Sequence, residues 1–279
     1  MMLSIGDLVL DVTIIPEHPL RPDDDNPAKI RVGGGGQAAN FCAWAASLGE
    51  PARLVTRVGD DDHGRRLVAG LAATGVEVFA VWGAEPTGAI AILVGPNGER
   101  TMATERGASV GLRPDDLVDE WFDGVELIHV PAYSLFTEPL ASASRAAVAS
   151  VRRAGGLVSI DLSSAAGLRE HGPARIAAEL SRLEPELLFA NRAESATLGT
   201  SMEKLARVPV LKLGSDGCQV SGRLIPAPNV RVVDASGAGD AFAAAFCASY
   251  LGGADPLKCA ERAVVVGSDA VTRVGARPA

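Results

Sequence analysis

The stretch Asp-Ala-Ser-Gly-Ala-Gly-Asp, from Asp234 to Asp240, places a carboxylate among small residues at the start of an apolar segment. Gly237, Ala238 and Gly239 have almost no side chains, so a ligand can approach their backbone closely. The first N–H groups of a helix lack intrahelical partners and carry the positive end of its dipole, which suits an anion. Asp240 would repel a resting phosphate there. The combination therefore predicts that Asp240 handles a proton while the N–H groups stabilise charge on a transferred group.

A second glycine-rich stretch, residues 33–36, precedes an alanine-rich segment that contains Asn40. Four glycines permit unusual dihedral angles and the close approach of a ligand, and Asn40 lies one helical turn further on. A flexible loop followed by an asparagine on a helix face is an equally open interpretation. Asp11 is expected directly after the first strand, where it is either a turn residue or an acceptor for two sugar hydroxyls. The glycine spacing does not match a dinucleotide-binding fingerprint.

Two further polar motifs follow predicted strands. Asn191 and Glu194 have the spacing of a capping box, but an amide and a carboxylate at a strand end also suit the waters around Mg²⁺. The segment Lys-Leu-Gly-Ser-Asp-Gly at 212–217 fits either a tight turn or contact with a nucleotide. The sequence contains no P-loop, GxSxG or HExxH motif, and its four histidines are far apart.

The composition is that of an ordinary globular chain, with 279 residues, 47% hydrophobic and 22% charged. The formal net charge of −8 disfavours nucleic acid and anionic membranes as partners. The four cysteines form no CxxC pair, which favours reduced thiols over zinc or disulfides. The N-terminus lacks the basic region of a signal peptide, and no apolar run reaches membrane-spanning length. We therefore expect a cytoplasmic protein.

Hydrophobic patterns predict repeated strand–helix units, which imply a parallel sheet covered by helices on both faces. Ligands of such sheets bind beyond the carboxyl ends of the strands. Strands are predicted at 3–9, 28–32, 51–58, 76–81, 125–130, 157–161, 186–190 and 208–213, with a short β segment at 217–226. Helices are predicted at 37–48, 63–74, 138–153, 173–182, 192–199, 238–251 and 255–270.

Extra strand material at 12–32 and 86–105 does not fit this alternation. Within it, Pro96-Asn97-Gly98 separates two β-rich arms and predicts a hairpin. The regular units therefore carry an additional small sheet.

The order of these motifs along the chain resembles that of the ribokinase (PfkB) family of sugar kinases. The resemblance extends over essentially the whole sequence and is most specific at 234–240. It implies a three-layer α/β/α sandwich with a mostly parallel central sheet and a small β-sheet lid. The expected organisation is a single kinase domain over 1–279, with lid segments at about 12–32 and 86–105 inserted in it.

The resemblance also implies the reaction, in which the γ-phosphate of Mg-ATP is transferred to a hydroxyl of a small sugar or sugar derivative. Asp240 matches the catalytic base, and the N–H groups of Gly237, Ala238 and Gly239 match the anion hole. Positions expected to contact the substrate are Asp11, Gly35, Gly36, Gln37, Asn40 and Arg106. Positions expected to contact the nucleotide or its Mg²⁺ are Asn191, Glu194, Lys212, Gly214, Ser215 and Gly217.

Several positions bear on the cofactor and the substrate. A site for a monovalent cation such as K⁺ is matched by Asp234, Ser236, Ala270, Arg273 and Gly275. Gln37 stands where ribokinase has a lysine and Val9 where it has an asparagine, so ribose itself is not implied. Val264 replaces a polar residue often found near the base of ATP. Arg106 is either a contact for an acidic or phosphorylated sugar or a surface arginine.

Three other functions stay open. A nucleoside kinase of the same family would need aromatic contacts for the base, and the chain has only seven Phe, three Trp and two Tyr. A sugar-binding sensor without catalysis would not need Asp240, Asn191 and Glu194. A dinucleotide oxidoreductase would need a GxGxxG motif after the first strand. The expected partners are a sugar and ATP, with a homodimer formed through the lid.

Overall fold

The computed structural model describes residues 1–95 and 100–278. The strands of the main sheet are β1 (Met2–Ile5), β4 (Ala52–Gly59), β5 (Glu77–Gly83), β8 (Leu127–Pro131), β9 (Leu157–Asp161), β10 (Leu187–Asn191), β11 (Val208–Lys212), β12 (Cys218–Val220) and β13 (Arg223–Ile225). The helices are α1 (Gln37–Ser47), α2 (Asp62–Ala72), α3 (Tyr133–Phe136), α4 (Leu140–Arg153), α5 (Ala165–His171), α6 (Pro173–Leu183), α7 (Arg192–Leu198), α8 (Ala238–Leu251) and α9 (Pro256–Ala270).

The main sheet has the order β13-β12-β11-β10-β9-β8-β1-β4-β5. Neighbouring strands from β5 to β11 run parallel, whereas β12 and β13 are antiparallel. The mostly parallel sheet predicted from the strand–helix alternation is therefore confirmed. The β segment predicted at 217–226 is in fact two strands, β12 and β13, that pair with each other.

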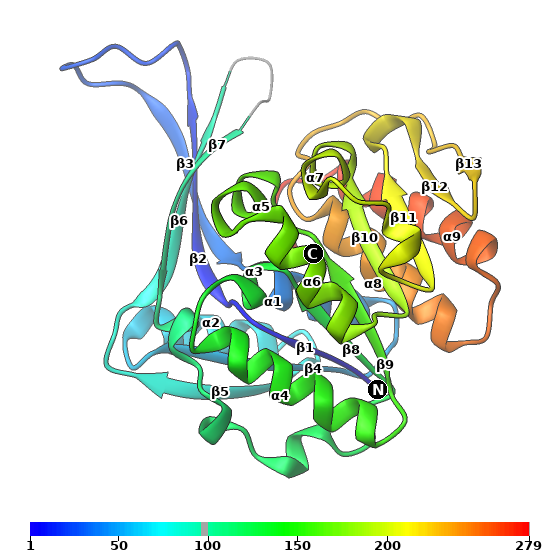
Figure 1. The fold of residues 1–279 in the computed structure, drawn as a ribbon. Helices are drawn as coiled ribbons and strands as arrows, with labels where there is room; N and C mark the ends of the chain where they lie inside the picture. The colour runs from blue at the N-terminus through cyan, green and yellow to red at the C-terminus, as the bar shows by residue number, and fades with distance from the viewer. Residues whose placement is uncertain (96–99, 279) are drawn as a thin grey trace.

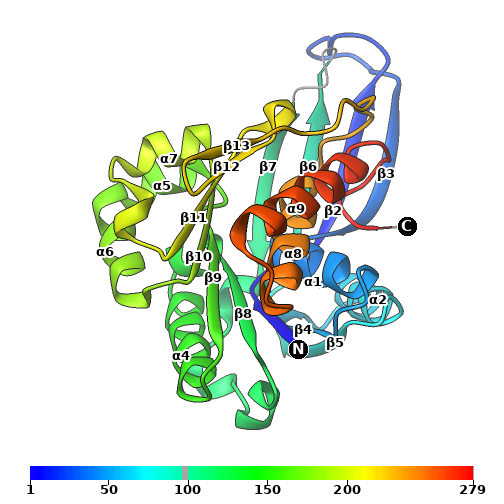
Figure 2. The same cartoon turned by 90° about the vertical axis from the view of Figure 1, so that its right-hand side faces the viewer.

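Helices cover both faces of the main sheet (Figures 1 and 2). The helices α1, α2, α8 and α9 lie on one face, and α4 to α7 lie on the other. In β10, Leu187 and Phe189 join the core under the first group, while Leu188 and Ala190 join the core under the second. Both faces of the strand are buried, which explains its continuous apolar sequence. The predicted three-layer sandwich is confirmed.

A second sheet of four strands projects beyond one side of the main sheet (Figure 1). Its strands are β2 (Val9–Pro16), β3 (Ala28–Gly35), β6 (Thr87–Val94) and β7 (Arg100–Gly107), in the order β3-β2-β6-β7. The extra strand material expected at 12–32 and 86–105 lies in this small sheet. The predicted hairpin arms pair as antiparallel β6 and β7, and the turn at Pro96-Asn97-Gly98 lies outside the described residues.

Two local predictions near the N-terminus are wrong. The first strand ends at Ile5, and Val9 already belongs to β2, so Asp11 lies within the small sheet and not after the first strand. Gly33 to Gly35 are the last residues of β3 and pair with β2, although the sequence suggested a loop. Ladder hydrogen bonds to a neighbouring strand supply the order that glycines lack locally.

The C-terminal helices match their predicted bounds almost residue by residue. They were predicted at 238–251 and 255–270, and the structure has α8 and α9 at these places. The short helices α3 and α5 were not predicted. Across residues 1–95 and 100–278, no helix combines the length and apolarity needed to cross a membrane.

Candidate active site

Polar side chains from adjacent strands gather at the carboxyl edge of the main sheet. Asp161 ends β9, Asn191 ends β10 and Lys212 ends β11, and Asn191 is directly opposite Lys212 in the ladder. Asp7 follows β1 on the same edge. Because parallel strands place their carboxyl ends together, residues up to 205 positions apart in the chain become neighbours.

Asp240 lies in the first turn of α8 and faces this edge. The helix begins after Gly237, which adopts a left-handed conformation with φ 70°, and Ala241 makes the first hydrogen bond back to the Gly237 carbonyl. Asn40 of α1 donates from Nδ2 to Asp240 Oδ2 at 3.0 Å. This bond leaves the second carboxylate oxygen of Asp240 available to a substrate.

The pKa of Asp240 is raised from 3.8 to about 7. Removal of the carboxylate from water is the main cause, and the nearby Asp161 adds to it. The hydrogen bond from Asn40 and the charge of Lys212 oppose the rise. A carboxyl group with a pKa near the working pH is suited to act as a general base.

Asp240 borders a cavity of about 270 Å³, called here the charged cavity, which lies between the sheet edge and the small sheet. Asp11 lines it, and Asp11 Oδ1 is buried without a hydrogen-bond partner in the described part of the chain. Burial raises the pKa of Asp11 to about 6, and the charge of Arg277 opposes this. An acceptor left unpaired in a cavity is suited to a hydroxyl donor of a ligand.

The glycine-rich stretch is shaped by the protein's own groups. A Cβ on Gly35 would lie 2.1 Å from Asp11 Oδ1, and a Cβ on Gly36 would lie 2.4 Å from the Asp7 carbonyl oxygen. Gly36, with φ 97°, is also the N-cap of α1. The sequence suggested room for a ligand here. The contacts show that the glycines also let Asp11 and the turn after β1 approach the start of α1, while Gly36 itself lines the charged cavity.

Arg106 of β7 reaches into the charged cavity and is not a free surface arginine. Its Nη1 donates to Asp7 Oδ2 at 3.2 Å, and its guanidinium lies 3.9 Å from the centroid of the Tyr133 ring. Asp7 also accepts from the Ala38 N–H through Oδ1. Gln37 lines the same cavity at the start of α1.

The wall opposite Asp11 carries an ion pair and a helix cap. Lys212 donates to the buried Asp161. Burial alone would lower the pKa of Lys212, but the carboxylates of Asp161 and Glu194 raise it. Glu194 accepts 2.7 Å hydrogen bonds from the backbone N–H and the side-chain amide of Asn191, which completes the predicted capping box. Burial and Asp161 raise the pKa of Glu194 to about 6.

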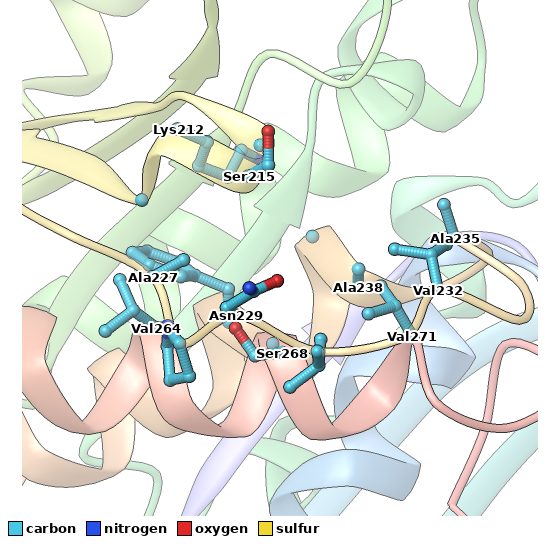
Figure 3. A pocket seen from close by; sticks show the side chains of 17 residues that line it. Lys212, Ser215, Ala227, Asn229, Val232, Ala235, Ala238, Val264, Ser268 and Val271 are labelled. Carbon is cyan, nitrogen blue, oxygen red and sulfur yellow. The ribbon is translucent and has the colours of Figure 1, made fainter.

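A second, apolar cavity of about 390 Å³ lies between α8, α9 and the end of β11 (Figure 3). Val264, Val271 and Val232 form much of its lining, and Gly214, Ser215 and Gly217 border it. A Cβ on Gly217, with φ 95°, would lie 1.9 Å from the Ile225 carbonyl oxygen, so this glycine also makes a tight turn. Ala238 lines the apolar cavity at the start of α8.

The two cavities meet at Lys212 and Gly239, which line both. Gly237 and Asp240 border the charged cavity next to this point. The N-terminus of α8 therefore stands between a compartment with apolar walls and a compartment with carboxylates. The first N–H groups of α8, which have no partner within the helix, lie where the two compartments meet.

Hydrogen bonds among the described residues join Asp234 to Ser236 and to the loop after α9 that was predicted to hold a cation. Asp234 accepts from the N–H and hydroxyl of Ser236 and, through Oδ2, from the Gly275 N–H at 3.0 Å. Arg100 of β7 also donates to Ser236 and lies 3.8 Å from Asp234 Oδ1. The side chain of Arg273 pairs with Asp269 on α9. The side chain of Ala270 is buried at the end of α9.

Sequence reasoning missed several residues of the site. Asp161 could have been found, because it ends the strand predicted at 157–161, and Asn191 and Lys212 lie at or beside the ends of the strands predicted at 186–190 and 208–213. Asp7 was hidden because the first strand was predicted to run through it. Nothing in the sequence indicated that Arg277 would reach Asn40.

Comparison with known proteins assigns the chain to a family. The model of the pfkB family of carbohydrate kinases matches residues 1–279. The chain belongs to this family. The kinase is 32% identical to an ATP-dependent ribose-1-phosphate kinase from Halopiger xanaduensis, covering 100% of this chain and 94% of the relative. Members of the family are phosphotransferases with an alcohol group as acceptor.

Solved structures share the fold over nearly the whole chain. An adenosine kinase from Sinorhizobium meliloti superposes with a TM-score of 0.89 and 24% identity, covering 99% of this chain and 95% of that one. A ribokinase II from E. coli, solved with ATP and Mg²⁺, has a TM-score of 0.84 and 24% identity, covering 99% and 94%.

Proposed function

We propose that this kinase transfers the γ-phosphate of ATP to a hydroxyl of a small sugar, with Asp240 as the catalytic base. The observation that carries the proposal is the meeting of the two cavities at the N-terminus of α8. The apolar cavity fits a nucleotide, and its valine-rich wall would accept the adenine ring. The charged cavity fits a polyol, because Asp11 offers an unpaired acceptor there.

The chemistry assigns one role to each group around Asp240. The substrate hydroxyl gives its proton to the Asp240 oxygen that Asn40 does not bind. Its oxygen forms the new bond to phosphorus while the bond to ADP breaks. The N–H groups of Gly237, Ala238 and Gly239 stabilise the charge on the transferred group, and Lys212 adds a positive charge.

The residues at the edge of the sheet fit Mg²⁺. Glu194 and Asn191 would hold it through water, since both Glu194 oxygens already accept hydrogen bonds but carboxylate oxygens have further lone pairs. When bound, the ion would neutralise phosphate charge. Support comes from the E. coli neighbour, which was solved with ATP and Mg²⁺.

A monovalent cation such as K⁺ is a separate part of the proposal. It would bind at the Asp234 carboxylate and adjacent carbonyl groups, beside the anion hole. The pKa of Asp234 is lowered, because hydrogen bonds from Gly275 and Ser236 outweigh the effect of burial, so the carboxylate carries its charge. Turnover measured in matched K⁺, Na⁺ and Tris buffers tests this site.

The acceptor is proposed to be a pentose-sized sugar, either free or phosphorylated. Arg100 and Arg106 both point into the charged cavity from β7, which suits an anionic substituent. A nucleoside is the second candidate, since the fold is shared with an adenosine kinase. Tyr133 is the aromatic residue bordering this cavity in the described structure, and Arg106 already covers its ring. A base would have to displace that arginine.

An assay of ADP release with ribose, ribose 1-phosphate, fructose and adenosine tests the proposal. We expect turnover with at least one sugar and loss of that turnover in Asp240→Asn, with ATP binding retained. Preference for adenosine would instead support the nucleoside kinase. ATP binding without transfer to any acceptor in a broad panel would support a sensor.

The organisation of the chain completes the proposal. We regard residues 1–279 as one kinase domain in which the small sheet acts as a lid over the sugar. Ile30 and Val32 on its outer strand β3 are 63% and 64% exposed, which suits contact between the lids of two copies. Light scattering of the wild type and Ile30→Lys tests the dimer. We propose that the kinase acts in the cytoplasm.

A further inference from the structure

The C-terminal segment 275–278 is held against the proposed active site. The Gly275 N–H donates to Asp234, and Trp44 Nε1 of α1 donates to the Ala276 carbonyl at 2.9 Å. A Cβ on Gly237 would lie 2.0 Å from the same carbonyl oxygen. The segment therefore runs between α1 and the turn before α8, and Ala276 lines the charged cavity.

Arg277 extends from this segment toward α1 and β3. Its Nε donates to Asn40 Oδ1 at 3.0 Å, and its Nη2 donates to the Gly35 carbonyl at 2.7 Å. A Cβ on Gly34 would lie 2.4 Å from Arg277 Nη1, so the guanidinium packs directly on the end of β3. The planar guanidinium thus joins the C-terminus to two elements of the site at once.

Asn40 connects this guanidinium to the proposed base. Its Oδ1 accepts from Arg277 while its Nδ2 donates to Asp240 Oδ2 at 3.0 Å. The ionised carboxylate of Asp240 only accepts and Arg277 only donates, so the two together hold the amide with its nitrogen toward Asp240 and its oxygen toward the guanidinium. We propose that Arg277 is a positioning residue, which through Asn40 orients the Asp240 carboxylate so that one oxygen stays free for the substrate proton. This inference depends on the proposed role of Asp240.

The charges around the guanidinium agree with this role. Within the described residues, no carboxylate lies within 4.0 Å of Arg277. Burial lowers its pKa to about 10, against the opposing effect of Asp11 above all, so it stays charged at neutral pH. Its positive charge is spread toward Asp11, Asp7 and Asp240 and is not neutralised by one of them.

Charged side chains of both signs lie near Asp240 and affect its protonation. The carboxylates of Asp161 and Asp7 favour its protonated form, while Lys212 and Arg277 favour the ionised form. Loss of Arg277 removes one of these positive charges and releases the Asn40 amide. A larger fraction of Asp240 should then be protonated at neutral pH.

The first test replaces Arg277 with methionine, which removes both donors and keeps most of the side-chain volume. We expect kcat to fall about 10- to 100-fold, a part of what a general base contributes. The KM for ATP should not change, because the apolar cavity does not contain Arg277. The acid limb of kcat/KM, which reports the free enzyme, should move to higher pH.

Two further variants separate orientation from charge and from folding. Arg277→Lys retains the charge but not the paired donors, so the acid limb should return toward its original pH while kcat recovers only in part. Arg65→Met removes an exposed arginine of α2 that pairs with Asp60 and Asp62 and does not line the charged cavity, so its pH profile should match the wild type. Thermal melting of every variant shows which proteins are folded. If Arg277→Met does not fold, the kcat and acid limb of Arg277→Lys provide the test of the inference.

A double substitution decides whether Arg277 acts through Asn40. Asn40→Ala alone removes the link, so adding Arg277→Met should cost little more. If the two effects multiply, or if Arg277→Met keeps the wild-type kcat and acid limb, the inference is overturned. Asp240→Asn distinguishes failure of this inference from failure of the proposed function. High activity in Asp240→Asn would show that Asp240 is not the catalytic base, whereas low activity would leave only the positioning role of Arg277 in question.

Discussion

Replacement of Asp240 by asparagine should make the protein more stable while it removes the activity. The folded protein raises the pKa of Asp240 from 3.8 to about 7, mainly because the carboxylate is taken out of water. Each pKa unit corresponds to about 1.4 kcal/mol, so full ionisation of Asp240 costs the folded state about 4 kcal/mol. Asp240 is only partly buried and borders the charged cavity, so water there reduces the cost to about 2–3 kcal/mol.

The sign of the pH dependence follows from the direction of this shift. The folded state binds the Asp240 proton more tightly than the unfolded chain, so the group destabilises the fold progressively between about pH 4 and pH 7. Above pH 7 the cost is constant, and below pH 4 it is absent. Asparagine has no such titration, and its amide oxygen can still accept from Asn40.

Urea denaturation at pH 5.5 and pH 8, without ligands, measures the effect. The advantage of Asp240→Asn over the wild type should grow by about 1–2 kcal/mol between these two pH values, which span about 1.5 pKa units below the folded pKa. Comparison of two pH values cancels the constant differences between the side chains. Asp115→Asn, at an exposed position, controls for the loss of a carboxylate as such. An advantage that is equal at both pH values, or larger at pH 5.5, would contradict the reasoning.

Three other substitutions test the packing of the site. Lys212→Met should lower the free energy of unfolding by about 3 kcal/mol and reduce kcat, because it leaves the carboxylate of Asp161 buried without its ion-pair partner. If the double variant Lys212→Met/Asp161→Asn regains both stability and kcat, Lys212 only balances the charge of Asp161 and has no direct role in the reaction. Gly35→Ala should raise the KM for the sugar more than the KM for ATP, since its Cβ would collide with Asp11, and a selective effect on ATP would refute this. Gly237→Ala should lower the melting temperature by several degrees, as it strains a φ of 70° and meets a carbonyl of the C-terminal segment; an unchanged melting curve would show that this segment moves aside.

The parts of the fold that were predicted depend on short-range patterns. The bounds of α8 and α9 were found because apolar residues with small neighbours run continuously from 238 and because Pro256 marks the start of the next helix. The strand β10 was found because both of its faces are buried, so Leu187 to Ala190 are apolar without interruption. These signals need no knowledge of distant contacts.

The parts that were mispredicted depend on partners far along the chain. Gly33 to Gly35 form a strand because β2 pairs with them, and the glycine sequence itself indicates a loop. Asp11 was assigned to the wrong element because the boundary between β1 and β2 is set by two different sheets. In each case, hydrogen bonds between distant segments outweigh local propensity.

For the chemistry, the sequence alone determined which groups are present and where the glycine-rich turn before α8 lies. The motif at 234–240 predicted a carboxylate beside free helix N–H groups, because the turn and the helix that carry it are formed by adjacent residues. Only the tertiary structure decided how that carboxylate is oriented and how strongly it holds its proton. Those properties come from Asn40, Asp161, Lys212 and Arg277, which lie on four other segments. Electrostatic and hydrogen-bond effects act through space, so their partners cannot be read from spacing along the chain.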